Sequence, residues 1–228
     1  MRRLILLCML AGCCIDNMQN PGQSFLGAPY IVSPLGEERA PDYDPLIRFD
    51  GFDCTTLVET VLADGDLMRL NKIRYKDGKI DFVSRNHFIE TDWLTNNSDL
   101  VHNASAKYAT PALRHVIIDK KAWFKRVHNM ETDFVPQVID FEYIPFAQAK
   151  QIHVSKPVIV LFVADNPKIR DKIGTDLAVV HMGFLLPDGT LRHASSQQKQ
   201  VVDVRFDEYI DERQKNKNNL GIAIVEIK

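Results

Sequence analysis

The stretch LAVVHMGFLLPDGTLRHAS, residues 177–195, contains two apolar runs separated by a turn signal. Pro187-Asp188-Gly189 combines a residue that restricts φ, a residue that bonds its own backbone and a residue that tolerates positive φ, a combination typical of turns. Each flanking run carries a single histidine, His181 before the turn and His193 after it. The stretch therefore predicts an antiparallel hairpin with an imidazole on each strand.

The length of the turn decides whether the two imidazoles can meet. Side chains alternate between the faces of a strand, so a plain two-residue loop would place His181 and His193 on opposite faces. A three-residue loop formed by Pro187–Gly189 makes them diagonal neighbours on one face, about 7–8 Å apart before side-chain reach. We expect the three-residue loop, with one imidazole orienting the other.

The rest of the chain predicts one α+β domain in which a helix packs on an antiparallel sheet. Asp53 is the expected N-cap of a helix that starts at Cys54 and continues to about Leu70. Residues 71–155 show no repeat and are expected to form a helical and loop-rich insertion. Further elements predicted after residue 155 are strands at Val158–Ala164, Val201–Val204 and Ile222–Ile227, and a short helix at Phe206–Glu212.

Cys54 has the position of a cysteine nucleophile. The N-terminus of a helix supplies partial positive charge and free backbone N–H groups, which we expect to lower the pKa of the thiol and to stabilise an oxyanion. His181 lies among apolar residues and needs a polar partner there. Taken singly, a buried cysteine and two core histidines would be ordinary structural residues. Together they predict nucleophilic catalysis.

Composition excludes several other classes of protein. The 228 residues carry a formal charge of −2 and a pI near 6.4, so no basic field would hold a nucleic acid. After residue 20, no segment approaches the roughly 20 apolar residues that span a bilayer. We expect one domain over residues 25–228, acting as a monomer and without a cofactor.

Residues 1–24 are predicted to be a leader and a linker. Arg2 and Arg3 precede the apolar run Leu4–Ala11, the charge order of a secretory signal, which predicts a periplasmic or otherwise exported protein. The box Leu10-Ala11-Gly12-Cys13 resembles a bacterial lipoprotein cleavage site, so Cys13 is the expected point of a lipid tether. An ordinary signal peptide is the alternative. With Cys8, Cys13 and Cys14 in the leader, Cys54 is the one cysteine left for the domain.

Four motifs resemble, in the same order, the NlpC-type branch of the papain-like cell-wall hydrolases. They are Leu26-Gly27-Ala28-Pro29-Tyr30, Phe52-Asp53-Cys54, His181-Met182-Gly183-Phe184 and Arg192-His193-Ala194-Ser195. The resemblance implies that Cys54 is the nucleophile, that His181 is the base and then the acid, and that His193 orients His181. It also implies that Tyr30 lines the site.

One departure narrows the resemblance. The common motif Asp-Cys-Ser-Gly is replaced here by Asp53-Cys54-Thr55-Thr56. This variant, together with Arg85-Asn86-His87-Phe88 and Trp93, resembles a narrower group within the superfamily. The members of that group are implied to be N-acetylmuramoyl-L-alanine amidases. The implied substrate is peptidoglycan or its fragments, and the implied binding residues are Tyr30, Arg85, Asn86, His87 and Trp93. Without the resemblance, Arg85 would be read as an ion-paired loop anchor.

Three alternatives stay open at the level of sequence. The enzyme could cut the peptide stem as a γ-D-glutamyl-diamino acid endopeptidase, as many members of the superfamily do. Cys54, His181 and His193 could hold zinc with an open fourth position, although no close pair of ligands supports this. The chain could also be a catalytically inactive wall-binding lipoprotein, although such a protein would not need all three residues.

Overall fold

The computed structural model describes residues 18–228. The predicted secretory signal and the lipid attachment at Cys13 lie outside these residues. Within residues 18–228, no helix is both long enough and apolar enough to cross a membrane.

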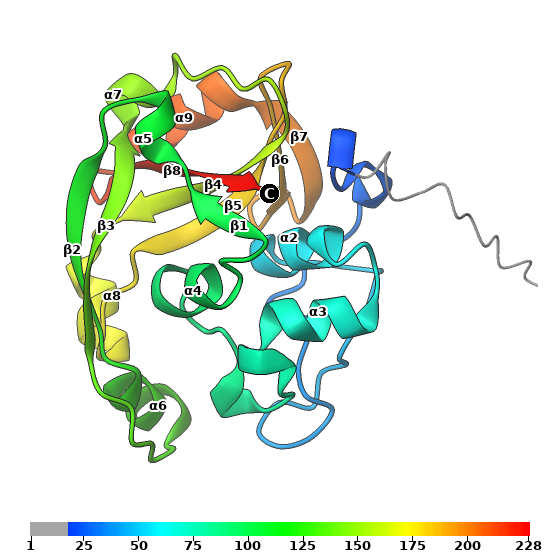
Figure 1. The fold of residues 1–228 in the computed structure, drawn as a ribbon, viewed down its shortest axis with the longest axis vertical. Coiled ribbons are helices and arrows are strands. Elements are labelled where there is room, and N and C mark those ends of the chain that lie inside the picture. The colour runs from blue at the N-terminus through cyan, green and yellow to red at the C-terminus, as the bar shows by residue number, and fades with distance from the viewer. Residues whose placement is uncertain (1–17) are drawn as a thin grey trace, which may run out of the picture.

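One antiparallel sheet forms the centre of the molecule (Figure 1). Its strands follow the order β2-β3-β8-β4-β5-β6-β7, and β1 pairs with β8. The bounds are β1 Val101–Asn103, β2 Ala112–Ile118, β3 Gln137–Pro145, β4 Val158–Ala164, β5 Val179–Leu185, β6 Thr190–Ser195, β7 Gln200–Arg205 and β8 Asn219–Ile227. The predicted α+β class with an antiparallel sheet is confirmed.

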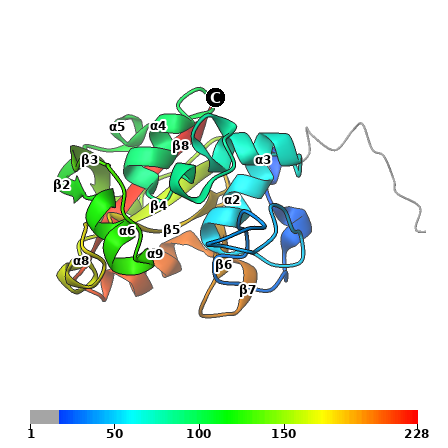
Figure 2. The same cartoon turned by 90° about the horizontal axis from the view of Figure 1, so that it is seen from below.

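Helices cover both faces of this sheet, as the two views in Figures 1 and 2 show. On one face lie α2 (Cys54–Leu62), α3 (Leu67–Arg74) and α4 (Leu94–Asn96), and on the other lie α7 (Phe146–Ala149) and α9 (Phe206–Gln214). Further helices of the described residues are α5 Ser105–Tyr108, α6 Lys120–His128, α8 Pro167–Ile173, the short 3-10 turns Gln23–Phe25, Lys76–Gly78 and Phe82–Ser84, and a π-helix at Ile89–Trp93.

The continuous apolar run of β4 reflects this double cover. Ile159 and Leu161 face the core beneath α2, whereas Val160 and Phe162 face the core beneath α9. Side chains alternate along a strand, so only a strand covered on both faces needs an apolar residue at every position. The predicted strand Val158–Ala164 is confirmed at both ends.

The predicted helix from Cys54 to about Leu70 is wrong in its extent. Asp64 and Gly65 have φ values of +54° and +68°, and a right-handed helix cannot pass through two residues in that region. α2 therefore ends at Leu62, and α3 begins at Leu67 with Asp66 as its N-cap. The apolar spacing runs across the break because both helices bury a face against the same core.

The interpretation of residues 71–155 as helices and loops is also incomplete. The segment contains helices, but β1, β2 and β3 extend the central sheet, and β3 pairs with β8 at Ile144 and Ile222. β2 alternates exposed residues such as Leu113 with buried Arg114 and Val116. A strand that buries one face, with a charged residue among its buried positions, lacks the continuous apolar run by which β4 was predicted.

The segment just before the domain is not the linker that its composition predicted. Arg192 of β6 donates hydrogen bonds to Asn20 Oδ1 at 2.6 Å and to the carbonyl oxygen of Pro21 at 3.1 Å. The same guanidinium pairs with both oxygens of Asp203 on β7, at 2.7 and 2.8 Å. Arg192 thus ties the first described residues to the strand that carries His193.

Replacing Arg192 is expected to release this segment. Arg192→Gln should lower the free energy of unfolding by about 2–3 kcal/mol, because the side chain is 3% exposed and its loss leaves Asp203, Asn20 and the carbonyl of Pro21 without their donor. It should also speed proteolysis before residue 25. Arg205→Gln is the matched control, because its pair with Asp207 is exposed and contributes little to stability. Urea unfolding and limited proteolysis test this, and equal effects of the two variants would contradict it.

Candidate active site

The start of α2 is fixed by a capping box. Asp53 Oδ1 accepts the backbone N–H of Thr56 at 2.8 Å, and Thr56 Oγ1 accepts the backbone N–H of Asp53 at 3.0 Å. The second oxygen of Asp53 accepts the N–H of Ser33 at 3.2 Å. The predicted cap is confirmed, and it makes Cys54 the first residue of the helix.

The β5–β6 hairpin has the register that the sequence predicted. Leu185 pairs with Leu191, and the N–H of Leu186 donates to the carbonyl oxygen of Thr190 at 2.8 Å, which leaves a three-residue loop. Gly189 closes the loop at φ +82°, a conformation that other residues rarely adopt. A one-residue change in this loop would move His193 to the other face of the sheet.

Close approach of the two strands brings the imidazoles together. A Cβ atom on Gly183 would lie 2.6 Å from the Arg192 carbonyl oxygen and 2.8 Å from His193 Cβ, so only glycine fits there. His181 Nε2 lies 2.8 Å from His193 Nδ1, and the rings are nearly perpendicular at 85°. The predicted same-face pair of histidines is confirmed.

The thiol of Cys54 lies against the strand that carries His181. The backbone of Met182, the residue after His181, makes a hydrogen bond to the thiol. Burial raises the pKa of Cys54 to about 11, and the negative charge of Asp53 adds to the rise. The expected lowering of the pKa by the helix N-terminus is therefore wrong. Desolvation of a thiolate outweighs the partial charge of the helix.

Both imidazoles are neutral at neutral pH. Burial lowers the pKa of His181 well below its ordinary value, and nearby His193 and Arg213 lower it further. Burial also lowers the pKa of His193 to about 4, and His193 is 2% exposed. A neutral imidazole can accept a proton, so the pair suits general-base chemistry at neutral pH.

Tyr30 lies next to the segment that leads into Cys54. Its backbone bridges to Phe52, two residues before Cys54, and its N–H donates to the carbonyl oxygen of Lys199 at 2.9 Å. Burial raises the pKa of Tyr30, and the charges of Cys54 and Asp53 add to this.

A pocket of about 160 Å³ lies beside the first turn of α2. Its lining residues are Ser33, Leu35, Asp53, Thr55, Thr56, Glu59, Arg74, Arg85, Asn86 and His87. Three of the predicted binding residues, Arg85, Asn86 and His87, therefore form one wall of a hollow whose other wall adjoins Cys54.

These three residues are already engaged within the protein. Arg85 pairs with Glu37 and Asp42 at 2.6 and 2.8 Å, the loop anchor that was its alternative interpretation. Asn86 Nδ2 donates to the carbonyl oxygen of Ile73 at 2.8 Å. His87 Nε2 lies 2.7 Å from the carbonyl oxygen of Phe82, and burial lowers its pKa to about 3. They shape the pocket rather than offer free hydrogen bonds.

Trp93 does not belong to the accessible site. Its side chain has no exposed surface and packs in the core beneath α2. The resemblance to the amidase group implied that Trp93 is one of the binding residues. The π-helix at residues 89–93 turns the indole inward instead.

Sequence reasoning missed Tyr209 and Arg213, one turn apart on α9. The Tyr209 ring centroid lies 4.9 Å from that of His193 and 6.1 Å from that of His181. Burial raises the pKa of Tyr209. The i, i+4 spacing on a predicted helix was visible, but nothing in the sequence showed which face of that helix meets the histidines.

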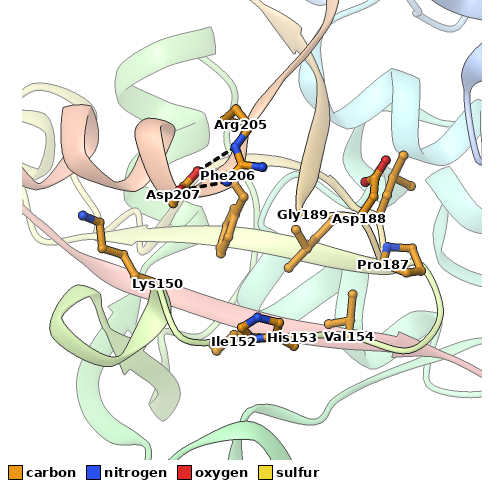
Figure 3. A pocket seen from close by; sticks show the side chains of 12 residues that line it. Lys150, Ile152, His153, Val154, Pro187, Asp188, Gly189, Arg205, Phe206 and Asp207 are labelled. Atoms are coloured by element: carbon orange, nitrogen blue, oxygen red, sulfur yellow. Dashed lines mark hydrogen bonds and ion pairs between the residues drawn. The ribbon is translucent and has the colours of Figure 1, made fainter.

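A larger pocket of about 310 Å³ lies at the opposite end of the hairpin (Figure 3). The turn residues Pro187, Asp188 and Gly189 line it, together with the exposed pair of Arg205 and Asp207. None of Cys54, His181 and His193 lines this pocket. It is therefore separate from the cluster around the thiol.

Within residues 18–228, no three His, Cys, Asp or Glu side chains are grouped so that they could hold a metal ion. This includes Cys54, His181 and His193, which do not form the three-ligand set of the zinc alternative. The geometry gives that alternative no support.

A family model described as AmiA-like, N-acetylmuramoyl-L-alanine amidase-like, matches residues 20–221. The chain belongs to this family. The match covers the start of α2 and the β5–β6 hairpin, and it confirms the predicted resemblance to the amidase-like group. A search of curated proteins finds no significant match.

Two solved structures resemble this protein over most of its length. A Legionella pneumophila protein is 25% identical and superposes with a TM-score of 0.82, covering 94% of this chain and 89% of that chain. An N-acetylmuramoyl-L-alanine amidase from Bacteroides uniformis is 26% identical with a TM-score of 0.71, covering 94% of this chain and 98% of that chain. Both similarities span nearly the whole length of each protein.

The lowered pKa of His193 predicts a pH-dependent stability. The unfolded chain binds a proton near pH 6.5, whereas folded His193 binds one only near pH 4, so stability is lost as the pH falls through this window. His193→Gln removes the imidazole whose protonation favours the unfolded chain. Relative to wild type, the variant should gain about 2 kcal/mol between pH 7.5 and pH 5.

Urea unfolding of both proteins at the two pH values measures this difference. His153→Gln is the matched control, because His153 is exposed. A wild-type to variant difference that stays constant between pH 7.5 and pH 5 would show that His193 is not held neutral by the fold.

Proposed function

We propose that this protein is a cysteine-dependent N-acetylmuramoyl-L-alanine amidase with an NlpC-type, papain-like site. Cys54 is the nucleophile, His181 the base and acid, and His193 the residue that orients His181. The observation that carries the proposal is the 2.8 Å contact between the two imidazoles, together with a cysteine at a helix start whose thiol bonds the backbone of Met182, the residue after His181. Membership of the amidase-like family and the similar B. uniformis amidase support the choice of substrate.

The histidine pair defines the path of the proton. His181 Nε2 is engaged by His193, so Nδ1 is the nitrogen that takes the proton of Cys54. A base at Nδ1 requires that Nε2 carries a hydrogen and donates it to His193 Nδ1. His193 is then the acceptor that holds His181 in the reactive tautomer.

The raised pKa of Cys54 decides how the reaction starts. A thiol whose pKa is about 11 is protonated at neutral pH, so attack needs transfer of its proton to His181 as the sulfur reaches the carbonyl. The resting site is a neutral thiol and a neutral imidazole. The mechanism is thus general-base assisted rather than dependent on a preformed thiolate.

The reaction proceeds in two halves. Sulfur attacks the carbonyl carbon of the lactyl group, the C–N bond breaks, and His181 gives its proton to the departing amine of L-alanine. Water then attacks the thioester, giving its proton to His181, and the carboxylate leaves as the thiol is restored. In the first turn of α2, the backbone N–H of Cys54 is suited to stabilise the oxyanion in both halves.

The pocket beside α2 is the proposed subsite next to the scissile bond. Its volume of about 160 Å³ suits a small group, such as one alanine or an acetamido substituent, rather than a whole disaccharide. Thr55 and Ser33 line the side nearest Cys54, and Arg85, fixed by Glu37 and Asp42, lines the other. Because Arg85 is held in place, this pocket would select substituents by their shape. The leader predicted in residues 1–24 supports an activity in the cell envelope.

The first test is mass spectrometry of muropeptides after incubation with the wild type and with Cys54→Ala. The wild type should release stem peptides that begin with L-alanine, and Cys54→Ala should lose at least about a thousandfold in turnover because it lacks the nucleophile. Thr95→Ala, on α4, is the control and should keep wild-type turnover.

The products separate the proposal from its alternatives. A disaccharide that keeps L-alanine and glutamate would replace the amidase by an endopeptidase. Full activity of Cys54→Ala would end the cysteine mechanism. Binding of muropeptides without any cleavage would favour a recognition protein.

The role of His193 is tested by its effect on the two kinetic constants. His193→Ala should lower kcat at least about tenfold and change KM little, because His181 loses the partner that fixes its tautomer while the substrate subsite is untouched. His193→Asn should recover part of the rate, since its amide oxygen can accept the same hydrogen bond. A large rise in KM with normal kcat would instead place His193 in the binding site.

A further inference from the structure

Arg213 is held over two aromatic rings next to the proposed base. Its Cζ lies 5.5 Å from the ring centroid of Phe162 and 6.0 Å from that of Tyr209. The same two rings lie 5.6 Å and 6.1 Å from the ring of His181. Cation–π contacts at these distances hold a guanidinium in one place. The proposed reaction does not use this side chain.

Arg213 lacks the carboxylate partner that comparable arginines have. Every other arginine of residues 18–228 that is buried or half-buried forms an ion pair with an Asp or Glu. These are Arg48, Arg74, Arg85, Arg114 and Arg192. Arg213 has no ion pair with any residue of that range, and its Nε is buried without an acceptor. A half-buried guanidinium without a carboxylate partner leaves a positive charge that a bound anion would neutralise.

The charge of Arg213 reaches the reacting groups. It contributes, after burial, to the lowered pKa of His193, and after burial and His193 to that of His181. An anion bound to Arg213 would offset this field. Its arrival would therefore make His181 a better proton acceptor at the moment that substrate is present.

We propose that Arg213 is a specificity residue that binds a free carboxylate of the peptide stem. This inference rests on the proposed function. A guanidinium accepts a carboxylate through two parallel hydrogen bonds, and the peptide stem carries free carboxylates whereas the neutral sugar groups do not. The position of Arg213 next to His181 selects the carboxylate closest to the scissile amide, that of the glutamate that follows L-alanine.

The test compares two muropeptides that differ only in this carboxylate, one free and one converted to the carboxamide. The wild type should prefer the free acid at least about tenfold in kcat/KM, mainly through KM. Arg213→Gln should lose this preference and cleave both substrates alike. Arg69→Gln removes an equal charge from an exposed position on α3 and should keep the preference. An unchanged preference in Arg213→Gln would overturn the proposal.

A structural role of Arg213 gives a different result. If the side chain only supports α9, Arg213→Gln would lower kcat for both muropeptides equally and leave their ratio unchanged, which refutes carboxylate recognition. Arg213→Lys keeps the charge and covers the case in which Arg213→Gln does not fold. Because it lacks the planar fork, it should retain a reduced preference for the acid.

Binding without turnover separates this inference from the proposed function. Calorimetry with Cys54→Ala should show at least about tenfold tighter binding of the free acid, and Cys54→Ala with Arg213→Gln should bind both muropeptides alike. Equal binding of the two muropeptides by Cys54→Ala overturns the role of Arg213. Carboxylate-dependent binding together with a wild type that cleaves neither would contradict the proposed amidase and leave the role of Arg213 supported.

Discussion

A three-residue loop at Pro187–Gly189 pairs Leu185 with Leu191 and thereby places His193 on the face of the sheet that carries His181. Because strand side chains alternate with a period of two, any shift of this register by one residue would turn one imidazole away. Gly183 is part of the same constraint, since a side chain there would collide with His193. The rest of the candidate site is arranged around the resulting pair.

Burial sets the electrostatics of the site. The sheet lies between two layers of helices, so groups on its central strands are far from water and their charged forms are costly. Burial raises the pKa of the Cys54 thiol and lowers that of both histidines. A partial charge at a helix end is too weak to reverse this. The site therefore rests in an uncharged state from which a single proton transfer starts the chemistry.

The accuracy of the sequence interpretation followed the strength of the local signal. Strands β4 to β8 were predicted because each is an apolar run bounded by turn residues or a helix, and the cap at Asp53 because side chain and backbone are close in sequence. β2 and β3 were missed because they bury one face only and their pairing with β8 is a long-range event. The break at Asp64 was hidden because both flanking helices keep apolar residues on one face.

The sequence by itself determined the α+β class, the cap of α2 and the register that joins His181 to His193, because each depends on interactions between residues near one another in the chain. Only the tertiary structure decided what surrounds them. It buried Trp93, bound Arg85 to Glu37, tied Asn20 to Arg192 and set Arg213 over Phe162. The physical reason is that burial and the pairing of charges depend on which distant segments share a face, and the pattern of residues along one chain does not state this.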